Sequence, residues 1–329
     1  MSYASVYTCA MDALAGLLDG PRAQGAFLLR SILDPPWSLR IEDEAPLTLV
    51  TMLRGFAWVV PQHEDAVHVR PGDVALMRGP DPYIVADDPT TPAQVLVQSG
   101  QRCTTISGED LYQTLDLGVR TWGNNPEGST VMLTGTYVMD SEVSKRLLTA
   151  LPTLLIVPEA AQESRLVDLL TEEVVKDEPG QEVILDRLLD LLLISVVRTW
   201  FSRDEAEAPA WYLAQGDPVV GPAIRMLYNN PAHPWTVGKL AAEIGISRAA
   251  LARRFTELVG EPPMAFLTSW RLALAADLLR EPGATVGTVA VQVGYGSPYA
   301  LSSAFKRVRG INPSEHRKAA NQLATLASA

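Results

Sequence analysis

The segment TVGKLAAEIG at residues 236–245 returns as TVGTVAVQVG at residues 285–294. Both copies open on Thr-Val-Gly, carry an Ala after a branched apolar residue, and close on Gly. After one extra residue in the second copy, the match continues at an offset of 50 through five identical pairs: Ser247 and Ser297, Leu251 and Leu301, Phe255 and Phe305, Gly260 and Gly310, Pro263 and Pro313. Self-similarity at a fixed period indicates that one supersecondary unit occurs twice.

Each copy has the pattern of two short helices joined by a tight turn. A Thr hydroxyl at the start can accept hydrogen bonds from the unpaired amides of the first helix. Apolar residues at i, i+1 and i+4 give that helix one buried side. A Gly then ends it in the left-handed region, and a Ser begins the second helix. The expected caps and turn residues are Thr236, Gly245 and Ser247 in the first copy and Thr285, Gly294 and Ser297 in the second.

A helix, a turn with Gly and a second helix with one apolar and one basic side form the helix-turn-helix pattern. The second helix has the size that fits the major groove of double-stranded DNA, about 12 Å wide. We expect it to contact DNA through Arg248, Ala249, Ala252, Arg253 and Thr256 in the first copy and through Tyr299, Ala300, Ser302, Ser303, Lys306 and Arg307 in the second. A helix over residues 264–280 would hold the two about one DNA turn apart. The alternative is a plain helical bundle whose arginines are only solvated.

The distribution of charge agrees with a DNA-binding C-terminal part. The whole chain has a net charge of −11. Residues 212–329 contain 12 Lys and Arg against 7 Asp and Glu, a net +5, whereas residues 1–211 contain 15 against 31. Because salt screens charges beyond about 8–10 Å, a basic domain can bind phosphates although it is tethered to an acidic one.

Residues 218–320 resemble the tandem helix-turn-helix domain of the AraC/XylS family of transcriptional regulators. The resemblance is carried by Pro234-Trp235-Thr236-Val237, Gly245-Ile246-Ser247-Arg248, Leu251-Ala252-Arg253-Arg254-Phe255 and Ala304-Phe305-Lys306-Arg307. It implies a regulator that binds double-stranded DNA, with RNA polymerase as a further candidate partner. His316 and Phe266 depart from the family pattern, in which Tyr is usual. Ala249 and Ala252 are small, so the first copy would read bases chiefly through Arg253.

The first 160 residues have a different pattern, made of short runs rich in β-branched residues and separated by Pro- and Gly-containing turns. These runs include residues 27–33, 47–60, 66–70, 74–77 and 131–139. Several strands with turns between them predict a sandwich or a small barrel. Trp37-Ser38-Leu39-Arg40, Leu53-Arg54-Gly55 and residues 69–74 resemble the cupin-type sensor domain of the same regulator family. The expected fold class is therefore α+β, with a cupin-like β-barrel at residues 1–160 and helices after it.

Metal-dependent cupins place histidines and a carboxylate inside the barrel. Here Leu47-Thr48-Leu49 stands where a His-x-His pair would be expected, and His63 and His68 lie in a polar hairpin, where solvated side chains are the simpler interpretation. We therefore expect no metal, no cofactor and no catalytic residue. A metal-dependent cupin enzyme is accordingly the least favoured hypothesis.

An organic effector is another use for such a domain. Alternation with period two puts Met52, Arg54 and Trp58 on one side of a strand, with Tyr83 near the position of a later histidine. If that side lines the barrel, Arg54 could receive an anionic ligand. The commoner explanation of the same pattern is an ordinary core or an outer face with ion pairs. Cys103 is a further candidate, as a sensor of redox state or electrophiles.

Residues 161–203 have the pattern of a helical hairpin around Asp177-Glu178-Pro179-Gly180. The apolar face of its second helix is wide enough for two surfaces, one on the barrel and one on a second subunit. The family resemblance favours a homodimer formed there. Residues 204–217 follow as a linker, and Asp217 is expected to cap the first helix of the DNA-binding domain.

The sequence gives no indication of a membrane or secreted protein. No apolar run reaches the ~18–20 residues of a membrane span, no signal peptide is recognisable, and Cys9 and Cys103 have no metal-type spacing. We expect a cytoplasmic transcription regulator that responds to a small organic effector. The alternative is an effector-independent regulator whose β domain only dimerises.

Overall fold

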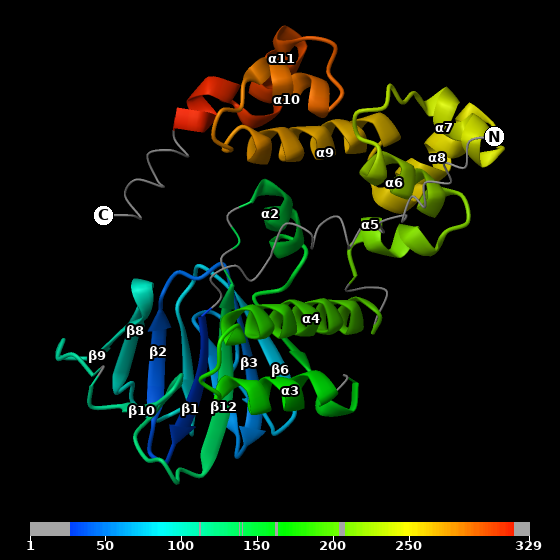
Figure 1. Cartoon of the computed structure of the whole chain (residues 1–329). Coiled ribbons are helices and arrows are strands. Elements are labelled where there is room, and N and C mark those ends of the chain that lie inside the picture. The colour runs from blue at the N-terminus through cyan, green and yellow to red at the C-terminus, as the bar shows by residue number, and fades with distance from the viewer. Residues whose placement is uncertain are drawn as a thin grey trace. The chain divides into compact units, whose positions relative to one another are not determined.

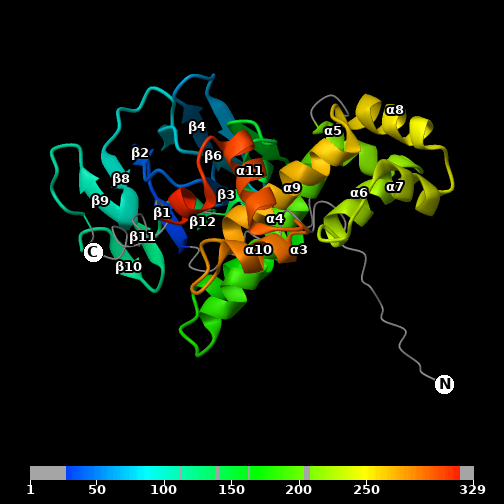
Figure 2. The same ribbon diagram turned by 90° about the horizontal axis from the view of Figure 1, so that it is seen from above.

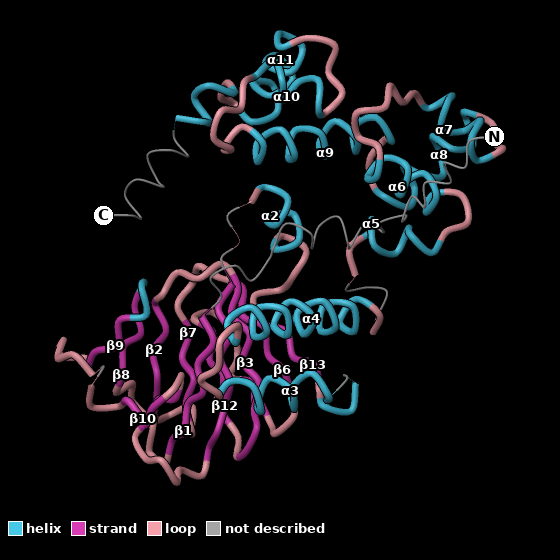
Figure 3. Tube along the Cα trace, viewed as in Figure 1, coloured by secondary structure: helices cyan, strands magenta, loops and turns pink. Residues whose placement is uncertain are grey.

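The computed structural model describes residues 27–318 except 112, 138, 140, 162–163 and 204–207. The described residues form two compact units. The β unit is made by those of Pro21–Met139 and Leu147–Glu207, and the helical unit by those of Asp140–Arg146 and Ala208–Ala329. The chain has the expected α+β class (Figure 3). Cys9 and residues 204–207 of the expected linker lie outside the described residues.

Two sheets build the β unit. The strands of the larger sheet are β1 (Phe27–Leu33), β3 (Leu47–Arg54), β6 (Val74–Arg78), β10 (Asp116–Gly118), β11 (Thr121–Gly123), β12 (Thr130–Tyr137) and β13 (Leu154–Val157). Those of the smaller sheet are β2 (Ser38–Glu42), β4 (Ala57–Pro61), β5 (Val67–Val69), β7 (Tyr83–Ala86), β8 (Val95–Gln98) and β9 (Arg102–Thr105). The strand orders are β10-β11-β1-β12-β3-β6-β13 and β5-β4-β7-β2-β8-β9. Most neighbours are antiparallel, but β1 with β11 and β2 with β8 are parallel.

The core of the β unit takes side chains from both sheets. Met52 and Met132 come from the larger sheet, Val59 and Val85 from the smaller, and all four are buried in one cluster. The expected barrel, however, is not closed. Closure requires the edge strands to pair, and the edges of the two sheets remain separate in the strand orders.

A second correction concerns residues 47–60, for which the pattern predicts one strand. They form β3 and β4, which belong to different sheets. Gly55 makes the break, because its φ of +70° suits glycine and a Cβ there would lie 2.8 Å from the carbonyl oxygen of Ser129. Trp58 therefore does not share a strand face with Met52 and Arg54.

The helical hairpin of the β unit consists of α3 (Ser164–Val174) and α4 (Gln181–Phe201), which lie side by side (Figure 1). α4 packs on the larger sheet, where the buried Tyr137 hydroxyl of β12 donates a hydrogen bond to the carbonyl oxygen of Leu189 at 2.8 Å. Its other side exposes apolar residues, among them Val183, Ile184 and Leu191. No helix in the described ranges is both long and apolar enough to span a membrane.

The helical unit is built around one long helix. Its helices are α5 (Ala210–Leu213), α6 (Val220–Asn229), α7 (Val237–Ile244), α8 (Arg248–Val259), α9 (Pro263–Leu278), α10 (Val286–Gln292) and α11 (Pro298–Arg309), with most of α2 (Glu142–Leu148). α9 runs between α6–α8 at one end and α10–α11 at the other (Figure 2). Phe266 and Trp270 pack into the core of α6–α8, whereas Leu272 and Ala276 pack into the core of α10 and α11. Because α9 is buried in both cores, it fixes the two helix pairs to each other.

Candidate nucleic-acid interface

The first helix pair is fixed by hydrogen bonds from its own side chains. Thr236 Oγ1 accepts a hydrogen bond from the amide of Lys239 at 3.1 Å and caps α7. Ser247 Oγ accepts one from the amide of Ala250 at 3.2 Å and caps α8. Gly245 ends α7 with a φ of +82°. The turn is therefore short, and α8 lies against α7 in the helix-turn-helix arrangement.

The second helix pair uses the same devices. Thr285 Oγ1 accepts a hydrogen bond from the amide of Thr288, and Thr288 Oγ1 accepts one from the amide of Thr285, each at 3.1 Å. Ser297 Oγ accepts from the first turn of α11 at 3.1 Å. Gly294 has a φ of +83°, and a Cβ there would lie 2.6 Å from the backbone of Ala232. A larger residue would therefore displace the chain that precedes α7.

The side of α8 that points away from the core carries the expected contact residues of the first copy. Arg248, Ala249, Arg253 and Thr256 are exposed, and Ala252 is half-buried. Arg253 has an ion-pair neighbour in Glu257, with Nε 3.8 Å from Oε1 and both side chains largely exposed. Because exposed pairs of this kind contribute little stability, the guanidinium can exchange this contact for DNA.

The corresponding side of α11 offers a richer set of groups. Tyr299, Ser303, Lys306 and Arg307 are exposed, and Ala300 and Ser302 are half-buried. Tyr299, in the first turn of the helix, is 81% exposed. An exposed ring at that point can contact a thymine methyl group, while the hydroxyls and cations can contact base edges and phosphates.

Two other arginines of these helices have partners within the protein. Arg254 donates to Asp217 Oδ2 through Nη2 at 2.5 Å and through Nε at 3.0 Å. Asp217 Oδ1 also accepts hydrogen bonds from two amides at the start of α6, each at 2.9 Å. Arg309 Nη1 donates to Glu142 Oε2 at 2.7 Å. The local sequence could not identify these partners, because they are 37 and 167 residues away.

Arg271 on α9 connects the two copies through partners that the sequence pattern does not indicate. Its Nε donates to the carbonyl oxygen of Pro231 at 2.6 Å, and its Nη2 to that of His233 at 2.8 Å. Its guanidinium carbon lies 5.9 Å from the ring centroid of Tyr295, which follows α10. Arg271 thus holds the chain before α7 next to the turn of the second copy.

Comparison with known proteins agrees with this arrangement. Residues 12–202 match the family profile described as "Cupin", and residues 240–319 match the one described as "Helix-turn-helix domain". A putative AraC-like transcription regulator of Streptomyces antibioticus is 32% identical over 70% of this chain and 76% of that protein. The chain belongs to the AraC family of transcription regulators. It joins a cupin domain to a DNA-binding helix-turn-helix domain.

Two further transcription regulators match this chain over almost its whole length. A putative AraC-like transcription regulator of Streptomyces lividans is 28% identical over 94% of this chain and 98% of that protein. The regulator AlkR of Acinetobacter baylyi is 26% identical over 94% of this chain and 99% of that protein. Among solved structures, the DNA-binding domain of AdpA in complex with a target DNA is 33% identical over 32% of this chain and 93% of that one, with a TM-score of 0.30.

The cupin domain of this AraC-family regulator contains a cavity of about 60 Å³ between its sheets. Apolar side chains from both sheets, such as Val50, Val85 and Trp122, form much of the wall. Four aliphatic hydroxyl groups belong to the lining as well, from Ser31, Thr48, Thr134 and Thr136. Asp43, Tyr83 and Cys103 complete its polar part. Burial raises the pKa of each of these three groups, so the phenol and the thiol stay protonated at neutral pH.

The structure separates the four residues expected to bind an effector. Tyr83 lines the cavity, and Met52 is buried in the neighbouring core. Arg54 ends β3 with an exposed side chain and donates to the carbonyl oxygen of Gly128 at 2.5 Å. Trp58 is half-buried on β4, with its ring centroid 4.8 Å from that of His68. Of the four residues, only Tyr83 belongs to the lining of this cavity, and an anionic ligand at Arg54 stays a prediction.

The histidines of the hairpin do not assemble a metal site. His63 is exposed in the turn after β4, and His68 on β5 contacts the rings of Phe56 and Trp58. In the ranges that the structure describes, no group of three or more His, Cys, Asp or Glu side chains is placed to hold a metal ion.

Proposed function

We propose that this AraC-family protein is a sequence-specific regulator whose helices α8 and α11 read DNA and whose β unit binds a small organic effector. The observation that carries the DNA part is the pair of capped recognition helices fixed by α9, each with an exposed side free of core contacts. The two helices differ in what they offer. α8 supplies Arg253 for base contacts, and α11 supplies Tyr299, Lys306 and Arg307.

The lining of the cavity supports a particular class of effector. Its wall is apolar with hydroxyl groups, and among the described lining residues Asp43 is the carboxylate while no Lys, Arg or His contributes. A buried carboxylate ligand would find no cation there and would be repelled by Asp43. The effector is therefore a small, largely apolar molecule that carries a hydroxyl or an amine.

A thermal-shift series tests this proposal with compounds that share one carbon skeleton as alcohol, amine and carboxylate. A ligand at 100 times its Kd should stabilise the folded protein by about 2.7 kcal/mol. We expect stabilisation by alcohols or amines, and its loss in Val85→Phe, which fills the cavity. Stabilisation by carboxylates, or stabilisation that persists in Val85→Phe, contradicts the proposed site. A series without any stabilising compound favours the alternative, a regulator whose β unit only dimerises.

We also infer that the regulator is a homodimer joined through the α3–α4 hairpin. α4 exposes Val183, Ile184 and Leu191, and α3 exposes Leu169, with Val175 directly after it. Large apolar side chains gathered on one hairpin are typical of an interaction surface. A second copy of the hairpin would bury these residues by symmetry.

A further inference from the structure

Part of the segment between β12 and β13 belongs to a different compact unit from the strands on either side of it. β12 ends at Tyr137 and β13 begins at Leu154, and both belong to the β unit. The described residues of Asp140–Arg146, which include the first turn of α2, belong to the helical unit. The first five residues of α2, encoded within the cupin part of the sequence, thus belong to the helical unit.

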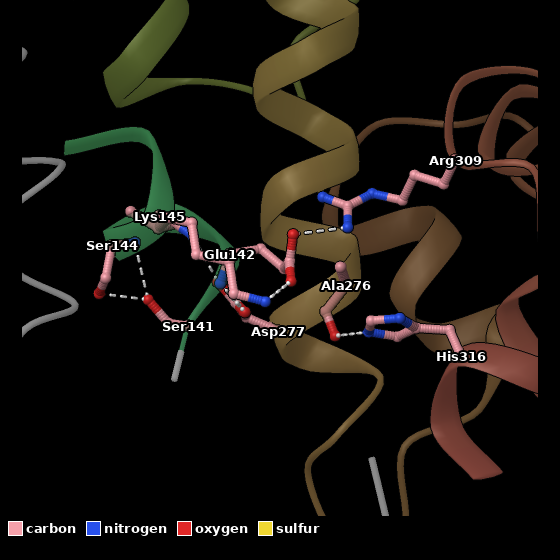
Figure 4. Close-up of polar contacts among 9 residues, drawn as sticks. Ser141, Glu142, Ser144, Lys145, Ala276, Asp277, Arg309 and His316 are labelled. Atoms are coloured by element: carbon pink, nitrogen blue, oxygen red, sulfur yellow. Dashed lines mark hydrogen bonds and ion pairs between the residues drawn. The ribbon is translucent and has the colours of Figure 1, made fainter. Parts of the chain in front are cut away.

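Asp277 on α9 holds the first turn of α2 (Figure 4). Its Oδ1 accepts a hydrogen bond from the amide of Glu142 at 2.6 Å, and its Oδ2 accepts one from the amide of Val143 at 3.1 Å. Ser141 Oγ accepts another from the amide of Ser144 at 2.9 Å. A carboxylate is favourable at a helix N-terminus, because unpaired amides and the positive end of the helix dipole meet it there. α2 is therefore capped both by its own chain and by α9.

The side chain of Glu142 connects the same turn to α11. Arg309 Nη1 donates to Glu142 Oε2 at 2.7 Å, and Lys145 Nζ donates to Oε1 at 2.6 Å (Figure 4). The side chains of Glu142 and Arg309 are only 17% and 22% exposed. Burial alone would raise the pKa of Glu142, but the hydrogen bonds and charges of Lys145 and Arg309 lower it, so the carboxylate is ionised. Removing either member of this pair would leave a poorly solvated charge.

Val143 and Arg146 contact the other helix-turn-helix copy. Val143 is 6% exposed and belongs to the core that α6–α8 share with the first half of α9. The guanidinium carbon of Arg146 lies 5.6 Å from the ring centroid of Phe266 and 5.9 Å from that of Trp270. Arg146 Nη1 also lies 3.4 Å from Ser269 Oγ. α2 therefore contacts the core of the first copy and the recognition helix of the second.

We propose that α2 is a positioning element for DNA recognition. It contacts α9, α11 and the core of α6–α8, and it thereby sets the arrangement of α8 relative to α11. Its connection to β12 also makes it the route by which the effector cavity controls that arrangement, a step that rests on the effector response proposed above. β12 contributes Met132, Thr134 and Thr136 to the cavity wall, and only residues 138–141 separate it from α2. An effector that moves β12 thereby shifts the population of DNA-binding arrangements.

Charge reversal tests the bridge in the full-length protein. The affinities of three variants are measured by fluorescence anisotropy: Glu142→Arg, Arg309→Glu and the double variant. Each is titrated with a selected operator duplex and with a random duplex of equal length. The double variant keeps the net charge of the parent, so it separates pairing from bulk electrostatics. We expect each single variant to lower the ratio of operator to random affinity about fivefold to tenfold, and the double variant to restore it to within about twofold. Lys145→Ala is the control, since it changes the same cluster without removing Arg309, and it should leave the ratio unchanged.

Bulk electrostatics predicts a different outcome. Glu142→Arg would then bind both duplexes more tightly and Arg309→Glu would bind both more weakly, with the ratio unchanged, and this result overturns the proposal. Asp277→Ala provides an independent variant, because it removes the acceptor of the Glu142 and Val143 amides. We expect faster hydrogen exchange at these two amides together with a lower affinity ratio. Faster exchange with an unchanged ratio also overturns the proposal, because α2 would then be released without consequence for DNA.

The link to the cavity has a separate measurement. Thr134→Leu fills the cavity from β12, and we expect it to change hydrogen exchange at the amides of Glu142 and Val143. Unchanged exchange at these amides overturns the link while the bridge itself stands. Neither experiment contains an effector, so their failure is distinguishable from failure of the proposed effector response.

Discussion

Arg253 and Arg254 are neighbours in the chain and have different roles. Successive residues of a helix point about 100° apart, so Arg253 faces solvent on the outer side of α8 while Arg254 reaches Asp217. The basic dipeptide is visible in the sequence, and the helical spacing predicts that Arg253 is the one that contacts DNA. The role of Arg254 could not be predicted, because its partner lies outside the repeat.

Substituting each of the two arginines tests this division. We expect Arg253→Ala to weaken binding to the selected operator by about 1–3 kcal/mol, the usual contribution of a base-reading arginine, and to relax preference at one position. Arg254→Ala should affect thermal stability more than preference. Lys306→Ala should weaken binding to all duplexes alike and reduce the salt slope by about 0.9. Titrations at several salt concentrations distinguish the three, and a uniform loss in Arg253→Ala would contradict its proposed role.

Asp217 predicts a pH dependence of stability. The hydrogen bond from Arg254 lowers the pKa of Asp217 to about 2, whereas a carboxyl group in an unfolded chain titrates near 3.9. A carboxylate with a lowered folded pKa stabilises the protein above about pH 4, and this contribution is lost as the pH falls toward 2. Asn can still accept the amide hydrogen bonds at the start of α6, but it cannot form the ion pair with Arg254. We therefore expect Asp217→Asn to reduce the free energy of unfolding by about 1 kcal/mol at neutral pH and to flatten its dependence between pH 4 and 2. Urea unfolding at a series of pH values measures both effects, and equal slopes for parent and variant would contradict them.

Among the secondary-structure elements, the sequence predicts correctly those features whose contacts join residues close together in the chain. Thr236, Ser247, Thr285 and Ser297 cap helices through amides three residues away, so the distances that matter lie within the quoted repeat. The division of residues 47–60 depends instead on the approach of Ser129 to Gly55, a contact between distant segments. An alternating pattern cannot show such a break, and for that reason Arg54 and Trp58 were predicted to share a face.

α2 illustrates the same limit. It is a short helix between two strands. Nothing in the sequence of residues 141–148 indicates that Asp277 and Arg309 form hydrogen bonds with it. Contacts across more than a hundred residues depend on the tertiary arrangement. The cavity is similar, since its wall combines residues from eight strands and one loop, of which the sequence suggested only Tyr83 and Cys103.

The exposed side of α4 predicts an association between copies. Leu191 is 51% exposed in the middle of the helix, so Leu191→Glu should leave the β unit folded while it places charge in a dimer interface. We expect the parent protein to sediment as a dimer and Leu191→Glu to shift toward the monomer in analytical ultracentrifugation. Arg102→Glu, exposed on β9 of the smaller sheet and outside the hairpin, is the control for added negative charge. A parent that is monomeric at micromolar concentration contradicts the proposed dimer.

At the scale of the whole molecule, the two parts of the chain differ in the sign of their net charge as well as in the domain that they contain. The acidic first two-thirds contains the cupin domain, and the basic last third contains the two recognition helices. The repeat and the charge balance predicted that division from the sequence alone. The structure adds that the boundary is not a single point in the chain, because a segment near residue 143 is part of the helical unit.

The central claim is that α8 and α11 together read DNA sequence. The most direct test incubates the full-length regulator with randomised duplexes at moderate salt, followed by recovery and sequencing of the bound DNA. We expect an enriched site with two elements about one helical turn apart, bound at least about a thousandfold more tightly than random DNA. Recovered sequences without a common element, bound no more tightly than random duplexes, would contradict it.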